Sequence, residues 1–242
     1  MTDFARLPHR LPPQPEISRL GGLACRIEDG AWPALSVVLQ VGQSALVNPQ
    51  AVLWKEPSVW LLDEAAGVVR ADGPGRLGFA RNGGGEIFPV PLMAGESVEV
   101  AAGCFLAACG VRFSRQMFSD LGARLAQGAE LAMDRFTADH ETAVVWVQAQ
   151  GAVLERGLTE GEPFDLRPGA LLCKDASVDV QAIPSDDTTG GVADLAWLRV
   201  TGPGRVAFQT MLLPVREPEG QSLRPANGLR GVAGTWLGRV QG

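Results

Sequence analysis

A pattern of glycine, proline and apolar residues recurs three times along this chain of 242 residues, and it constrains the fold more than any other feature. Each copy begins with a glycine followed by Gln or Glu, and it carries apolar residues three and five positions later. A turn rich in proline or glycine and an apolar pair then follow. The copies start at Gly42, Gly95 and Gly161; the turn glycines of the second and third copies are Gly103 and Gly169; the apolar pairs begin at Val52, Phe105 and Leu171.

The spacing within each copy is typical of a β-hairpin. Apolar side chains two positions apart share one face of a strand, because side chains alternate between the two faces. Pro168-Gly169 suits a type II turn, since proline fixes φ at the first central position and glycine accepts the positive φ of the second. The apolar pair then begins the returning strand. The pattern therefore predicts three hairpins in which the glycines serve the backbone.

A second element is also repeated. The sequence Gly-Pro-Gly-Arg occurs twice, each time before a stretch of alternating large residues, with glycines at Gly73, Gly75, Gly202 and Gly204. The amides of these glycines, together with Arg76 or Arg205, could form a cradle for an anion. However, neither copy continues into Lys-Ser/Thr or a helix, as a phosphate-binding loop would. We therefore interpret each copy as a tight turn that leads into a strand.

The turn content predicts an all-β fold. Glycine and proline, at 30 and 17 residues, favour many short strands over a helical bundle. We expect three tandem β-hairpin repeats in a β-prism or sandwich, with one short helical insert that Ser119 would cap. The expected parts are a proline-rich arm (1–19), a β domain (20–215) with units at about 20–70, 71–118 and 140–183, closing strands at 192–213, the helical insert at 119–136, and a C-terminal extension (216–242).

The charge and the scarcity of metal-binding residues exclude several classes of function. A net charge of −6 does not offer the basic face that binds phosphate backbones, so nucleic acid is a disfavoured partner. The chain has two histidines and no Cys-x-x-Cys pair, which leaves no pattern for a metal or cofactor. The four cysteines stand among apolar residues and are expected to be buried thiols: Cys25, Cys104, Cys109 and Cys173.

The N-terminal sequence and the apolar runs point to a soluble protein. The first twenty residues lack the apolar stretch of a secretory signal. The longest apolar run, Val100 to Val111, is too short to span a bilayer as a helix. We therefore expect a cytoplasmic protein without a transmembrane segment.

Tryptophans are the best candidates for an interaction surface. The chain has six tryptophans and no tyrosine. Trp146 and Trp197 stand in apolar strands and are expected in the core. Trp54 and Trp60 flank Lys-Glu-Pro, and they could either fill the core or form an exposed platform for a partner.

Carboxylates at equivalent positions of the repeat are a further candidate. Glu96 and Glu162 follow the first glycine of their copies, where Gln43 stands in the first copy. Two carboxylates could serve acid–base chemistry. Glutamine at the same position favours hydrogen bonding to turn amides instead.

Four stretches of the chain resemble the altered inheritance of mitochondria protein 24 family. They are LMAGESVEVAAGCFLAACGVRF (92–113), VVWVQAQG (144–151), GLTEGEPFDLRPGALLCKD (157–175) and GPGRVAFQT (202–210), and the resemblance covers about residues 20–215. It implies a fold related to the tryptophan RNA-binding attenuation protein, in which three β repeats form a prism or sandwich, and it implies frequent self-association. Fungal relatives are mitochondrial and concern inner-membrane organisation. The resemblance implies no catalytic residues.

Three functional hypotheses follow, and the first is favoured. The chain is a non-enzymatic β-repeat protein that forms homo-oligomers or docks a partner, because exposed strand edges must be covered. The second hypothesis, an RNA-binding module, rests on fold analogy alone and is opposed by the acidic charge. The third is an enzyme with an unrecognised site, which would need clustered carboxylates with raised pKa values in a pocket.

Overall fold

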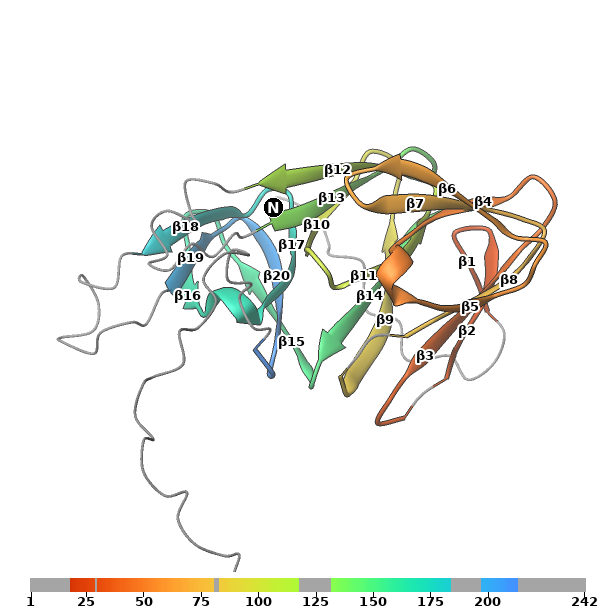
Figure 1. Ribbon diagram of the computed structural model, residues 1–242. Coiled ribbons are helices and arrows are strands. Elements are labelled where there is room, and N and C mark those ends of the chain that lie inside the picture. The colour runs from red at the N-terminus through yellow and green to blue at the C-terminus, as the bar shows by residue number, and fades with distance from the viewer. Residues whose placement is uncertain (1–17, 29, 81–82, 118–131, 184–196, 213–242) are drawn as a thin grey trace, which may run out of the picture.

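The computed structural model describes residues 18–28, 30–80, 83–117, 132–183 and 197–212, and in this part the fold is all-β. Four antiparallel sheets lie in a row (Figure 1), and we name them A to D. Sheet A has the order β1(Ser18–Leu20), β2(Leu23–Glu28), β3(Ala34–Leu39), β8(Gly75–Phe79), β5(Val52–Lys55). Sheet B has the order β6(Trp60–Ala65), β7(Val68–Asp72), β4(Ser44–Val47), β11(Phe105–Cys109), β14(Ala143–Gln150), β9(Gly85–Leu92).

The other two sheets continue the row. Sheet C has the order β12(Val111–Met117), β13(Ala132–Ala138), β10(Ser97–Ala101), β17(Leu171–Asp175), β20(Gly204–Gln209), β15(Val153–Leu158). Sheet D has the order β16(Pro163–Leu166), β19(Trp197–Thr201), β18(Asp179–Ile183). Two short 3₁₀ turns, Pro49–Ala51 and Pro168–Ala170, precede β5 and β17.

The core lies between the sheets, in three clusters of buried side chains. The sequence of strand β14 is apolar at successive positions because both faces of the strand are covered. Val144 and Trp146 pack in the cluster shared with sheet A, whereas Val145 and Val147 pack in the cluster shared with sheet C. A strand that is covered on both faces reads as a continuous apolar run rather than an alternating one. The sequence Val-Val-Trp-Val therefore belongs in the middle of the stack.

The same set of strand pairings occurs in three successive segments, 34–79, 85–150 and 153–209. Each segment has six strands; the sixth pairs with the first and third, and the fifth pairs with the second and fourth. The first-to-sixth pairs are β3–β8, β9–β14 and β15–β20; the third-to-sixth pairs are β5–β8, β11–β14 and β17–β20. The second-to-fifth pairs are β4–β7, β10–β13 and β16–β19; the fourth-to-fifth pairs are β6–β7, β12–β13 and β18–β19.

Successive segments are joined edge to edge. The second strand of one segment pairs with the third strand of the next, as β4–β11 and as β10–β17. These two junctions turn the half-sheets of neighbouring segments into the six-stranded sheets B and C.

The helical insert predicted at 119–136 is not seen. Residues 118–131 lie outside the described residues, and Ala132–Phe136 belong to strand β13, which pairs with β10 and β12. Asp134, Phe136 and Ala138 are buried at alternate positions. Ala132 and Phe136, which the helical spacing rested on, are also an even number of residues apart, so they fit a strand equally well. Pairing on both sides decides in favour of the strand.

The turns differ in detail from the expected type II geometry. Gly103 has a positive φ of 89°, but Pro168–Ala170 forms a 3₁₀ turn and Gly169 is not among the glycines with positive φ. In the first segment, Asn48 caps the equivalent 3₁₀ turn by accepting a hydrogen bond from the Gln50 amide. Gly42, Gly95 and Gly161 have φ values of 79°, 82° and 72°, a region that glycine enters without steric cost.

Candidate functional site

Large apolar side chains are exposed on β5 and β6, the strands that carry the two candidate tryptophans. Trp60 has 69% of its surface exposed and Trp54 has 43%. The neighbours Leu53, Leu61 and Leu62 are also exposed. By contrast, Trp146 is fully buried and Trp197 is partly buried. The structure therefore places Trp54 and Trp60 at the surface, on two successive strands that together carry five exposed large apolar side chains.

Trp54 lies over the neighbouring strand β8. It pairs with Gly78, and a Cβ atom added at Gly78 would collide with the Trp54 indole. At the equivalent pair of the second segment the sizes are reversed, because Ala107 faces Trp146. Gly78 thus makes room for a tryptophan that keeps one side open to solvent.

Strand β5 is also an open edge of sheet A. Within the part of the chain that the structure describes, β5 pairs only with β8, and β16 at the far end of the molecule pairs only with β19. Their equivalents in the other segments have neighbours on both sides. The two open edges lie at opposite ends of the row of sheets in Figure 1. An open edge presents unpaired N–H and C=O groups that another strand can bind.

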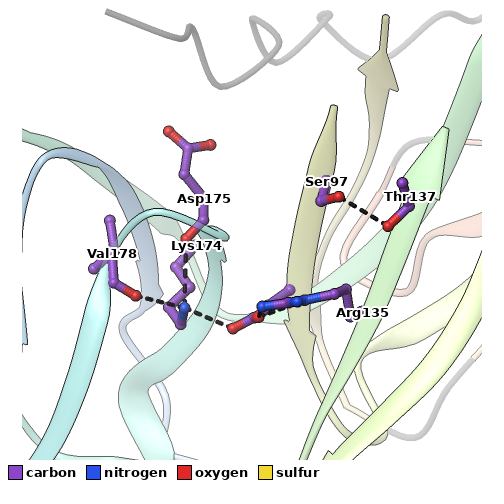
Figure 2. A network of polar contacts seen from close by, with 7 residues as sticks. Ser97, Arg135, Thr137, Lys174, Asp175 and Val178 are labelled. Atoms are coloured by element: carbon purple, nitrogen blue, oxygen red, sulfur yellow. Dashed lines mark hydrogen bonds and ion pairs between the residues drawn. The ribbon is translucent and has the colours of Figure 1, made fainter. Parts of the chain in front are cut away.

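A buried ion cluster joins the second and third segments. Glu99 on β10 and Lys174 on β17 are almost fully buried, and the Lys174 Nζ atom lies 2.6 Å from Glu99 Oε2. Arg135 on β13 binds the same carboxylate, donating from Nε at 2.8 Å. Lys174 also donates to the Val178 carbonyl at 2.6 Å. Figure 2 shows this network, with a hydrogen bond between Ser97 and Thr137 beside it.

The predicted turn carboxylates accept hydrogen bonds from the chain itself. Glu96 accepts from the Met93 amide, Glu162 from the Thr159 amide, and Gln43 from the Gln40 amide. The Thr159 amide, followed by the Arg156 side chain, lowers the pKa of Glu162 to about 2. All three side chains therefore stabilise their turns by accepting a hydrogen bond from a turn amide. This is the role that Gln43 at the equivalent position predicts.

The two Gly-Pro-Gly-Arg turns are likewise bound by carboxylates of the chain. Glu56 accepts a hydrogen bond from the Arg76 amide, and Asp175 accepts one from the Arg205 amide. Burial raises the pKa of Asp175 to about 6, against the lowering effect of the Arg205 amide. The anion cradle considered from sequence is therefore occupied by the chain's own side chains.

A shallow hollow beside the β4–β11 junction is the place where a catalytic pair could be sought. Cys109 and His140 both line it, together with Arg70 and Asp139. However, burial raises the pKa of the Cys109 thiol, and that thiol donates its hydrogen to the Gly21 carbonyl. A thiol held in this way is a poor nucleophile.

The remaining three cysteines lie in the interior of the fold. Cys25, Cys104 and Cys173 are buried and free of disulfides. Among the described residues, no group of three His, Cys, Asp or Glu side chains is arranged to hold a metal ion. No described helix is long and apolar enough to cross a membrane.

Comparison with known proteins decides the family. The family model described as "Mitochondrial biogenesis AIM24" matches residues 25–211, about three quarters of the chain. The chain belongs to the AIM24 family. No curated protein matches it. Among solved structures, the AIM24-family fold seen here is similar to the crystal structure of protein SPYM3_0169 from Streptococcus pyogenes, with a TM-score of 0.63 and 14% identity over 78% of this chain and 94% of the other.

The buried ion cluster is the feature that reasoning from the sequence missed. A signal was present, because Glu99 and Lys174 each interrupt an apolar strand. Lys55 and Lys174 are also the only lysines in the chain, and each follows its apolar pair by the same number of residues. A charge inside an apolar run indicates a buried partner.

Proposed function

We propose that this AIM24-family chain is a non-enzymatic scaffold that acts by binding protein chains, its own or others, through the open strand edges at its two ends. The observation that carries the proposal is the β5–β6 surface, where an unpaired strand edge coincides with exposed Leu53, Trp54 and Trp60. The backbone N–H and C=O groups of an open edge form hydrogen bonds with an incoming strand, and the aromatic side chains beside the edge add apolar contact area.

The recurring order of pairings supports a further part of the proposal. We interpret the three segments as equivalent repeats of a prism-like body related to the tryptophan RNA-binding attenuation protein. In such a body each repeat buries its neighbour's edge, so the terminal repeats are left with one edge each. The poor nucleophile at Cys109 agrees with a role that involves no catalysis. A cytoplasmic location stays a prediction.

Binding measured with a matched pair of variants tests the proposal. Leu53→Asp places a charge on the β5–β6 surface, where the leucine is 66% exposed and its loss should leave folding intact. Met93→Asp introduces the same charge at a methionine that is 68% exposed on the turn between β9 and β10. We expect Leu53→Asp to lose complexes seen by sedimentation and by affinity capture, and Met93→Asp to keep them. Equal binding by both variants would contradict the proposal.

A further inference from the structure

The two junctions between segments share one register, and this register is the starting point. Positions on the second strand are counted from the glycine that precedes it, which is Gly42, Gly95 or Gly161. Positions on the third strand are counted from its β-bulge. The residue four positions after the glycine faces the second residue after the bulge in both junctions. The pairs are Leu46 with Ala108 and Val47 with Ala107 at β4–β11, and Glu99 with Lys174 and Val100 with Cys173 at β10–β17.

The open edges have the same markers. Strand β5 carries its bulge between Val52 and Trp54, as β17 does between Leu171 and Cys173, so Lys55 is the equivalent of Lys174. On β16, Asp165 stands four positions after Gly161 and is the equivalent of Glu99. The third junction that the register defines would therefore pair Asp165 with Lys55.

Each open edge carries half of the buried ion cluster. Arg199 lies opposite Asp165 on β19 and binds it at 2.8 Å, as Arg135 binds Glu99, and this contact lowers the pKa of Asp165. Lys55 donates to the Val59 carbonyl at 2.9 Å, as Lys174 donates to the Val178 carbonyl. Each half already has the geometry of the complete cluster.

The exposure of β5 also identifies it as half of a junction. Leu106 and Leu172, the bulge leucines of the second and third segments, are fully buried in clusters that include side chains of the preceding segment. The equivalent Leu53 is 66% exposed. Lys55 is likewise exposed, whereas Lys174 is 3% exposed. Leu53 and Lys55 are thus residue types that are buried at the equivalent junction positions. They are exposed on β5 because no segment precedes the first one.

We propose that a second copy of this chain covers the edge: β16 of one molecule pairs antiparallel with β5 of the next. Asp165 lies opposite Lys55, Leu166 opposite Trp54 and Phe164 opposite Glu56. This inference rests on the proposed function and names its partner. The two edges lie at opposite ends of the molecule (Figure 1), so the contact is head-to-tail and builds a ring or a filament.

A cross-link between two single-cysteine variants tests both the partner and the register. Lys55→Cys and Asp165→Cys are prepared separately, with tags of different size, and then mixed under mild oxidation. Opposed residues of antiparallel strands have Cα atoms about 4.5–5.5 Å apart, within disulfide range. Loss of the ion pair does not prevent pairing, because the β4–β11 junction forms with Leu46 and Ala108 at these positions. We expect a disulfide-linked dimer in the mixture and not in either variant alone.

Controls separate the native thiols and other edges from the proposed contact. The parent chain, which has four cysteines, is oxidised under the same conditions as the control for the native thiols. Asp179→Cys places a thiol on β18, the other edge strand of sheet D, and should give no dimer with Lys55→Cys. In sedimentation, Lys55→Glu should weaken self-association about tenfold or more, since it faces Asp165 with a like charge. Lys55→Ala, which copies Ala108, should retain it.

Three outcomes would overturn the inference. A disulfide dimer of Lys55→Cys alone would mean a two-fold β5–β5 contact. In the second outcome, the parent chain stays monomeric and a photo-reactive residue at position 53 cross-links a different protein. The edge would then bind another partner, and the proposed function would stand without this inference. A monomeric chain with no cross-linked partner in a lysate of its native host would remove both the inference and the proposed function.

Discussion

Replacing Lys174 with methionine tests whether the Glu99 cluster holds the second and third segments together. Lys174→Met keeps the length of the aliphatic side chain and removes the ammonium group 2.6 Å from Glu99 Oε2. The carboxylate, 1% exposed, then retains Arg135 but loses the lysine, and the Val178 carbonyl loses its lysine donor. Breaking a buried pair in this way costs about 3–5 kcal/mol in the free energy of unfolding. That is a large share of a typical stability of about 5–15 kcal/mol.

The double variant separates the charge interaction from simple packing. Glu99→Leu leaves an unpaired lysine and is also expected to cost about 3–5 kcal/mol. In Glu99→Leu/Lys174→Met both charges are absent, and the junction resembles the apolar β4–β11 junction, where Leu46 faces Ala108. We expect the double variant to lose less than the sum of the single variants, with a coupling of about 2–3 kcal/mol.

Equilibrium unfolding in urea, followed by tryptophan fluorescence and by far-ultraviolet circular dichroism, measures these values. The denaturant slope should stay constant across the set, because the surface exposed on unfolding is unchanged. Single-variant losses that add, with a coupling below about 0.5 kcal/mol, would refute the reasoning that the cluster acts as one unit.

Three further predictions concern the core, the pH dependence and the thiols. Trp146→Ala should lower the free energy of unfolding by about 3–5 kcal/mol because its side chain is fully buried, whereas Trp60→Ala, at a residue 69% exposed, should change it by less than about 0.5 kcal/mol; urea unfolding measures both. The folded-state pKa of Asp175 is raised from 3.8 to about 6, so the folded state keeps its proton longer and stability falls as pH rises from about 4 to 6; Asp175→Asn should remove that fall, about 1–3 kcal/mol, in unfolding curves compared across this range. Cys173 is buried and its thiol pKa is raised, so a thiol reagent should modify it only on unfolding and Cys109 sooner, as mass spectrometry of timed samples would show; equal rates would contradict the burial argument.

The all-β class was predictable from the sequence because local signals specify it. Turn glycines and alternating or continuous apolar runs define where strands begin and end, and these are properties of neighbouring residues. The partner of each strand was not predictable, since β10 pairs with β13 and β17, which lie far along the chain. Such pairings depend on which faces must be buried together in three dimensions. The strand at Ala132–Ala138 was missed for the same reason.

The candidate surface was predicted in part. Trp54 and Trp60, which flank a polar turn, were candidates either for the core or for an exposed platform, and the structure places both at the surface. Their meaning comes from the edge on which they lie, and an open edge is a property of the whole sheet. The sequence did contain the clue in its two lysines, at equivalent positions of the first and third copies. The sequence alone does not distinguish the exposed Lys55 from the buried Lys174, because the strands that pair with theirs are not known from it.

The placement of charge in a junction between segments also fixes its register. If β10 slipped by one residue against β17, Glu99 would face Asp175 instead of Lys174, and two carboxylates would be opposed in a buried site. The same logic applies to the proposed contact between copies, where a slip of Asp165 in that direction would place it opposite Glu56. An acidic residue on one edge and a lysine followed by an acidic residue on the other thus favour one alignment. Apolar side chains alone would supply attraction without choosing among alignments.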